Sequence, residues 1–253
     1  MTLAAYVLCA TPRSGSTMLC EMLAATGVAG RPNSYFRAED VEAWADAWGV
    51  PRPRGIEDPA FDRAYLAAVR REGGAGTGVV GLRLMWASVA EAARRLDRVL
   101  GTERDVAESL EAAFGPVLYV HVSRRDKVAQ AVSRVRAEQS GMWHRAADGT
   151  VLEGAASPAP VSYDGAHVAA VLAELEGDEA AWRAFFAERG IEALRLVYED
   201  VAADPQGALA RVLAALGLDP AAAARTPVRT SRLADEESRL WIERFRREGG
   251  SPC

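Results

Sequence analysis

A cluster of arginine and hydroxyl side chains around one glycine is the first feature of the sequence that could do chemistry. It comprises Arg13, Ser14, Gly15, Ser16 and Thr17. A glycine lets backbone N–H groups approach an anion, the hydroxyls donate further hydrogen bonds, and the arginine adds a full positive charge. Capping a helix needs only one such side chain, so this cluster favours a phosphate-binding loop over a simple helix cap.

The loop differs from the P-loop of nucleoside triphosphatases, G-x-x-x-x-G-K-[ST], because it contains no lysine. Lys127 is the only lysine of the chain, and it lies far downstream. The sequence therefore disfavours ordinary ATPase or GTPase chemistry at this loop.

A second candidate anion site contains Arg124, Arg125 and Ser133. Ser133 lies about two turns into the helix that begins after Asp126, so it faces roughly the same side as the start of that helix. Arginine offers a planar fork of donors that matches phosphate oxygens, and a hydroxyl completes the set. Alone, this segment is more simply a helix start with solvated arginines. Because the loop from Arg13 to Thr17 is already a candidate anion site at the end of the first strand, we interpret this segment as a second phosphate site.

The elements that must position these clusters alternate along the chain. Short apolar runs predict buried strands over residues 4–10, 79–85, 117–122 and 193–197. Helices are expected over residues 17–26, 60–71, 88–100, 105–114, 127–140, 167–189 and 205–216. This alternation predicts an α/β fold, a parallel sheet flanked by helices, with sites beyond the carboxyl ends of the strands.

The composition is that of a globular protein. The chain has 253 residues, 49% hydrophobic and 26% charged, and we expect one domain over residues 1–253. Its net charge of −5 argues against general binding of nucleic acid or membrane surfaces. The three cysteines form no disulfide framework or metal pattern. With no signal peptide or long apolar span, we expect a cytoplasmic location.

Two stretches look like loops, residues 49–58 and 141–164. The second is longer than the roughly 12–15 residues beyond which an unstructured loop tends to be functional or mobile. A substrate lid and a floppy insertion are both open interpretations of it.

Five segments in the same order resemble the bacterial trehalose 2-sulfotransferase-like family, over nearly the whole chain. They are Thr11 to Thr17, Ala25 to Pro32, Gly81 to Trp86, Arg124 to Ser133 and Trp241 to Phe245.

The resemblance implies a P-loop-NTPase-like sulfotransferase fold and an enzyme without a metal. Such an enzyme transfers a sulfuryl group from 3′-phosphoadenosine-5′-phosphosulfate (PAPS) to a hydroxyl of a carbohydrate or small metabolite, by in-line displacement, and releases adenosine 3′,5′-bisphosphate (PAP). The loop from Arg13 to Thr17 would hold the 5′-phosphosulfate. Arg124 and Ser133 would hold the 3′-phosphate, with Arg125 as a rival because other sulfotransferases place an arginine eight residues before the serine. A homodimer is implied by resemblance only.

Ser34 departs from the family pattern, which has a glutamate there that is thought to accept the acceptor's proton. A neutral serine cannot act as a base unaided. A nearby acid could have taken over, Glu39 first and Asp40 beside it, with His121 and His144 as further candidates. Alternatively, the acceptor is acidic, such as a phenol, or the chain binds PAP or PAPS without catalysis.

Aromatic side chains could line an acceptor pocket, because sugars and aryl groups pack on rings. The candidates are Tyr35, Phe36, Trp44, Trp48, Trp86 and Trp143, with His144 beside the last. Trp182, Phe185 and Phe186 are better explained as core. A remaining rival function is a P-loop kinase acting on a small molecule, which would require magnesium and ATP.

Overall fold

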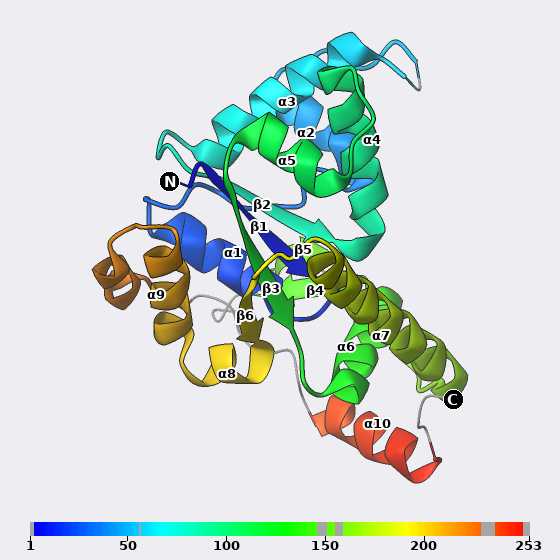
Figure 1. Cartoon of the computed structure of the whole chain (residues 1–253). Coiled ribbons are helices and arrows are strands. Elements are labelled where there is room, and N and C mark those ends of the chain that lie inside the picture. The colour runs from blue at the N-terminus through cyan, green and yellow to red at the C-terminus, as the bar shows by residue number, and fades with distance from the viewer. Residues whose placement is uncertain (1–2, 56, 146–150, 155–158, 229–235, 250–253) are drawn as a thin grey trace.

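The central element is a sheet of four parallel strands in the order β2-β1-β3-β6 (Figure 1). The computed structural model describes residues 3–55, 57–145, 151–154, 159–228 and 236–249. The strands are β1 (Ala5–Ala10), β2 (Val80–Met85), β3 (Val117–Ser123) and β6 (Leu194–Val197). The predicted α/β fold is confirmed, and all four predicted strands are present.

The register of the strands brings their carboxyl ends to one edge of the sheet. Ala10, the last residue of β1, pairs with Met85 on β2 and with Val122 on β3. β1 is fully buried along its whole length, as expected of a strand with neighbours on both sides and helices on both faces. The segments that follow β1 and β3 must therefore start close together.

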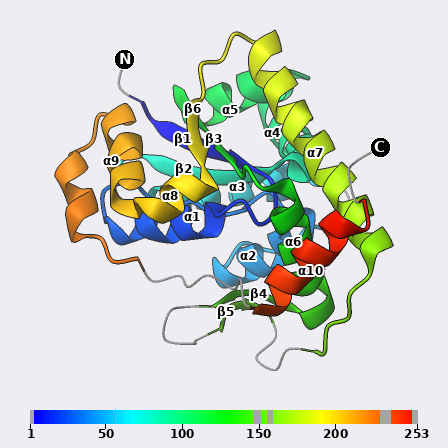
Figure 2. The same cartoon turned by 90° about the horizontal axis from the view of Figure 1, so that it is seen from below.

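Helices cover both faces of the sheet (Figures 1 and 2). They are α1 (Ser16–Ala25), α2 (Val41–Ala47), α3 (Pro59–Gly74), α4 (Val89–Leu100), α5 (Val106–Phe114), α6 (Lys127–Ser140), α7 (Gly165–Glu188), α8 (Tyr198–Ala203), α9 (Pro205–Ala215) and α10 (Glu236–Arg247). Three 3₁₀ turns span Ala38–Asp40, Trp86–Ser88 and Pro220–Arg225.

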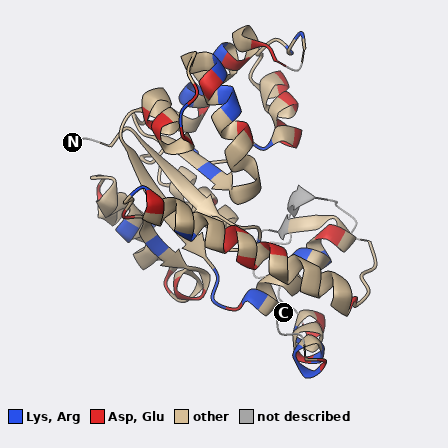
Figure 3. Cartoon of the chain, turned by 45° about the vertical axis from the view of Figure 1, so that its right-hand side comes forward, with Lys and Arg blue, Asp and Glu red and all other residues tan. Residues whose placement is uncertain are grey.

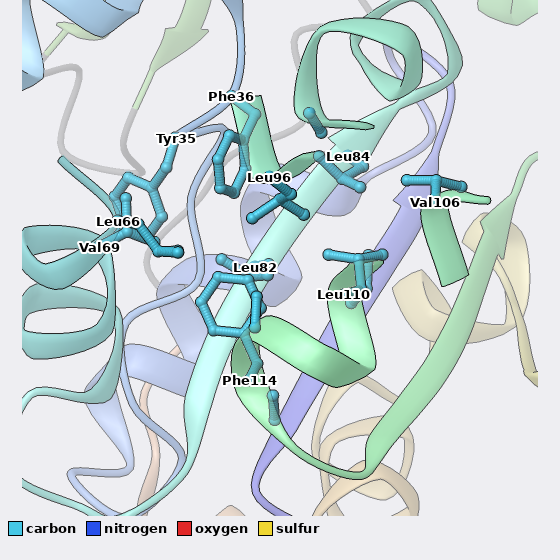
Figure 4. Close-up of a cluster of buried hydrophobic side chains, with 14 of the residues drawn as sticks. Tyr35, Phe36, Leu66, Val69, Leu82, Leu84, Leu96, Val106, Leu110 and Phe114 are labelled. Atoms are coloured by element: carbon cyan, nitrogen blue, oxygen red, sulfur yellow. The ribbon is translucent and has the colours of Figure 1, made fainter. Parts of the chain in front are cut away.

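The alternating side chains of β1 divide the core in two. Val7 and Cys9 pack with residues of α3, α4, α5 and the second half of α7, and Figure 4 shows part of this cluster, including Leu82, Leu96 and Phe114. Tyr6 and Leu8 pack on the other face, with α1 and α9. A third cluster joins α6, α7 and α10. Acidic and basic residues are interspersed along the outer helices (Figure 3).

The long segment over 141–164 is not simply a loop. It contains an antiparallel pair, β4 (Met142–Arg145) and β5 (Val151–Gly154), which lies away from the central sheet (Figure 2). In contrast, the described residues of 49–58 form no helix or strand, as predicted.

A buried ion cluster joins α7 and α6 to the segment after β1. Nζ of Lys127 lies 3.2 Å from Oε2 of Glu179 and donates to Oε1 of Gln130 at 3.1 Å. Nε2 of Gln130 in turn donates to Oγ1 of Thr11 at 2.8 Å. Burial by itself would raise the pKa of Glu179, but His121 and Lys127 outweigh it and lower that pKa to about 2. Lys127 therefore helps to position the segment after β1, because it holds Gln130, which in turn contacts Thr11.

No helix in the described part of the chain combines the length and the apolarity needed to cross a membrane.

Candidate active site

The glycine of the first cluster is required by the backbone and by the space around it. Gly15 has a φ of 86°, in the left-handed region that favours glycine. A Cβ atom built there would lie 2.6 Å from Cδ2 of Tyr198, the first residue of α8. Arg13 also has a positive φ, 64°, which is uncommon for a residue with a side chain and is often found at functional sites. The loop is thus held in a tight, specific shape.

The loop presents donors that the described residues do not use. Ser14 is fully buried, and its Oγ has no hydrogen-bond partner in the described part of the chain. α1 begins at Ser16 without a side-chain cap. A buried hydroxyl without a partner costs about 1–3 kcal/mol, and uncapped helix N–H groups attract anions. Both features fit an anionic ligand and argue against a loop that only caps α1.

The two predicted clusters meet in one place. Nε of Arg13 donates to Oγ of Ser133 at 3.0 Å, and the Arg13 guanidinium also donates to the carbonyl of Trp143. Nη1 of Arg124 donates to the carbonyl of Arg13 at 3.3 Å. The Arg124 guanidinium lies 4.6 Å from the centre of the Tyr198 ring. The loops after β1 and β3 therefore form a single polar site.

The structure separates Arg124 from Arg125. The Arg125 side chain is 63% exposed and pairs with Asp200 at 3.1 Å. Its backbone N–H donates to Glu199 at 3.0 Å, which holds the residue on the outside of the loop. Arg124 is the arginine whose side chain contacts Arg13.

A cavity of about 390 Å³ opens beside the loop. Its wall includes residues from the loop, from the segment after α1 and from α7. They are Pro12, Arg13, Gly15, Ser16, Thr17, Ser34, Arg37, Ala38, Glu39, Arg83, Met85, Ala87, Ser88, Glu91, Arg134, Glu138, Trp143, Glu174 and Asp178. A small polar molecule in this cavity would contact the same Arg13 that joins the two clusters.

Arg83 is a site residue to which the sequence analysis assigned no role. It lies on β2, and its Nε donates to Oγ of Ser34 at 2.8 Å while Nη1 donates to Oγ1 of Thr17 at 2.7 Å. It thus connects the phosphate-binding loop to the residue that departs from the family pattern. The available signal was an arginine inside an otherwise apolar, buried strand, which is unusual without a function or a partner.

The four candidate bases lie in different surroundings. Asp40 does not line this cavity, and its Oδ2 lies 3.4 Å from Nη1 of Arg37. Glu39 lines the cavity, but its side chain is 72% exposed and lies 3.4 Å from Arg37. His121 belongs to the buried ion cluster instead, 3.4 Å from Glu179, and does not line the cavity. His144 is in β4, and its side chain lies outside the described residues.

Asp178 on α7 is a further carboxylate in the cavity wall. Burial, together with the charge of Glu174, raises the pKa of Asp178 above its ordinary value. From the sequence, only Trp182, Phe185 and Phe186 of this helix were expected to have a role, namely core packing. Nothing in the spacing of its residues distinguished Asp178 from other acids on its surface.

The predicted aromatic residues divide between core and cavities. Phe36 is buried in the core, and the Trp86 ring packs against Trp182 with centroids 5.0 Å apart. Neither residue lines the cavity beside the loop, since Phe36 belongs to the core and Trp86 packs against it. Trp143 does line this cavity.

A second cavity of about 660 Å³ lies between α1 and α2. Tyr35 lines it together with Trp44 and Trp48, whose rings stack with centroids 5.2 Å apart. Thr17, Arg37 and Arg83 line both cavities. The two cavities are therefore neighbours that share a wall.

The arrangement suits a ligand with more than one anionic group and a second molecule beside it. Within the ranges that the structure describes, no group of three or more His, Cys, Asp or Glu side chains is placed to hold a metal ion.

A parallel α/β sheet with a tight glycine turn between its first strand and the helix that follows belongs to the P-loop-like class of folds, whose members often bind a phosphate group at that turn. Comparison with protein families identifies the family of this chain. The model of the Stf0 sulphotransferase family matches residues 5–248. The chain belongs to this family and is a sulfotransferase.

Two curated relatives share about a third of its sequence. The trehalose 2-sulfotransferase of Mycobacterium tuberculosis is 32% identical over 265 positions, which cover 96% of this chain and 94% of the relative. The trehalose 2-sulfotransferase of Mycolicibacterium smegmatis is 33% identical over 267 positions, covering 96% and 95%. The resemblance to this family is confirmed.

We predict that Gly15→Ala destabilises the protein more than Gly27→Ala, at the other end of α1. Gly27 has a similar φ of 70° but open space around it, so its substitution costs only the backbone strain, about 1–2 kcal/mol. Gly15→Ala adds the collision with Tyr198. Denaturant unfolding of both variants, repeated in a Tyr198→Ala background, measures the difference. The extra cost should vanish without the ring, and its persistence would contradict this explanation.

Proposed function

We propose that this sulfotransferase uses PAPS as its donor and transfers the sulfuryl group to a hydroxyl of a carbohydrate or another small metabolite. The contact between Arg13 and Ser133 carries the proposal, because it unites two anion-binding clusters in one site. A donor with a 5′-phosphosulfate and a separate 3′-phosphate needs two such clusters. The names of the two relatives support a sugar acceptor.

The loop from Arg13 to Thr17 would hold the 5′-phosphosulfate. The unused Ser14 hydroxyl and the uncapped start of α1 fit a group that accepts hydrogen bonds there. Arg124 and Ser133 would hold the 3′-phosphate. Arg125 is a poorer candidate because its side chain pairs with Asp200 on the outside.

PAPS, when bound, supplies a sulfuryl group whose leaving group is a phosphate oxygen. In the transfer, the bond from sulfur to that oxygen breaks as the acceptor oxygen forms a new bond to sulfur. Arg13 and the N–H groups of the loop would stabilise the negative charge that develops on the departing oxygen. The cavity beside the loop would orient the acceptor hydroxyl, which supplies much of the remaining rate enhancement.

The acceptor hydroxyl must also lose its proton. Ser34 cannot accept it as a neutral hydroxyl, and its Oγ already accepts a hydrogen bond from Arg83. Glu39 and Asp178 are carboxylates in the wall of the same cavity. We propose that one of these two is the base. The raised pKa of Asp178 suits this task, since an effective base has a pKa near the working pH.

Two expectations from the sequence remain predictions: that residues 1–253 form one domain, and that the protein is a homodimer.

The central test is transfer of labelled sulfate from PAPS to a panel of sugars, including trehalose, and phenols. We expect transfer that is unaffected by EDTA, and Arg13→Ala should lower kcat by about 10²–10³-fold, as expected for loss of one donor to a developing oxyanion. Arg125→Ala is the matched control and should keep most activity. Strict dependence on magnesium and ATP would instead indicate a kinase. Silence across the panel, with PAP still bound, would indicate a non-catalytic binding protein.

We predict that Arg124→Ala weakens binding of PAP by more than tenfold but changes binding of adenosine 5′-phosphate little. The physical reason is that a hydrogen bond to a charged group contributes about 1.5–3 kcal/mol, and only PAP has the 3′-phosphate. Isothermal titration calorimetry with both nucleotides measures this, with Arg125→Ala as the control. An equal loss for both nucleotides would assign Arg124 to another role.

The base is identified by the pH dependence of kcat/KM. A base is active when deprotonated, so activity falls as the pH drops through its pKa. For Asp178 this fall should occur above the ordinary aspartate value of about 3.9, because its pKa is raised. Asp178→Asn and Glu39→Gln should be compared with the wild type. The base variant loses this acidic limb and about 10²–10⁴-fold in rate. An intact limb in both variants would contradict the assignment.

A further inference from the structure

Arg83 lies where the two cavities meet and is nine-tenths buried, with 9% of its surface exposed. Its guanidinium carries five N–H groups. The described partners are only two hydroxyl groups, Ser34 Oγ and Thr17 Oγ1. No carboxylate in the described ranges lies within 4.0 Å of its nitrogen atoms. The charge of Arg83 thus has no counter-charge in direct contact.

Three other cations of this chain lie directly against buried carboxylates. Arg95 and Arg98 both lie 2.6 Å from the buried carboxylate of Asp62. Lys127 lies 3.2 Å from the buried Glu179. Removing a cation from water without pairing it costs several kcal/mol, and these pairs offset that cost. Among the described residues, Arg83 has no such carboxylate partner, although it lines both cavities.

Binding of PAPS, the proposed sulfuryl donor, does not require Arg83. Arg13, Arg124 and Ser133 already provide cations and a hydroxyl for the two anionic ends of PAPS. None of these three residues lines the 660 Å³ cavity, whereas Arg83 does. The same cavity has the stacked rings of Trp44 and Trp48 in its wall.

The wall of this cavity also holds the carboxylates of Glu21, Asp40 and Glu72. Asp40 lies 3.4 Å from Arg37 and Glu72 lies 2.8 Å from Arg71, so these two acids already have cationic partners. Next to Arg83, the cavity suits a flat ring that carries an acidic group.

We infer that Arg83 is an acceptor-binding residue, and that the acceptor carries an anionic group, such as a carboxylate, in addition to the hydroxyl that is sulfated. This inference rests on the proposed function. Arg83 would hold the anion through its remaining N–H groups, in a charge-assisted and bidentate geometry that arginine provides well. Ser34 permits this, because its hydroxyl accepts from Nε without neutralising the guanidinium.

The test uses benzoate and benzamide, two flat probes that differ in charge. Each is titrated into protein saturated with PAP, while NMR follows the Nε–Hε resonance of Arg83, assigned by its loss in Arg83→Lys. We expect benzoate to shift this resonance saturably and to bind about tenfold or more tightly than benzamide, as for a hydrogen bond to a charged partner. Equal responses, or none from benzoate, would overturn the inference.

Two substitutions at one position provide matched variants that do not remove Arg83. Ser34→Glu places a carboxylate against the guanidinium and should abolish the response to benzoate, whereas Ser34→Ala should keep it. A benzoate response that persists in Ser34→Glu would contradict the role of Arg83. If benzoate binds only in the absence of PAP, Arg83 serves the donor, and the inference is also wrong.

The failure of the proposed function is a separate result. PAP binding is measured independently by calorimetry, and its absence would refute the PAPS-dependent function. The benzoate titration can then be performed on the free protein and still decides whether Arg83 binds an anion.

Discussion

The register between β1 and its two neighbours is the constraint on which the site depends. Because Ala10 pairs with both Met85 and Val122, the chain leaves three adjacent strands at the same level. Arg13 follows the first of them, Arg124 the third, and Arg83 lies near the end of β2. A shift of two residues in either pairing would displace the paired strands by about 6–7 Å. That displacement would break the hydrogen bond from Arg124 to the Arg13 carbonyl or the one from Arg83 to Thr17.

The distribution of charge follows from the need to pair buried ions. Asp62 neutralises two arginines in the core, and Glu179 neutralises the only lysine. These clusters are structural: the second one supports Thr11 through Gln130. Around the candidate site the pattern changes, because buried polar groups such as the Ser14 hydroxyl have no described partner. A folded protein keeps such groups unpaired where a ligand will use them.

The proposed donor site and the proposed acceptor side differ in how well they match the family pattern. The loop from Arg13 to Thr17 and the residues Arg124 and Ser133 match the segments that carry the family resemblance, whereas Ser34 departs from it. Ser34 changes the acceptor side, because it removes an acid from a position that touches Arg83. An enzyme with the same donor chemistry and a different acceptor is the simplest physical interpretation of that difference.

The sequence alone determined the sheet, its main helices and the two clusters of arginine and hydroxyl side chains, because apolar periodicity and the residues between a strand and the next helix are local properties. It did not determine which of Arg124 and Arg125 faces inward, nor that Phe36 and Trp86 fill the core, nor that Arg83 and Asp178 line a cavity. Those outcomes depend on contacts between residues far apart in the chain, such as Ser34 with Arg83 and Arg125 with Asp200. Only the tertiary structure decides them, because side-chain direction is set by packing between elements and not by spacing within one.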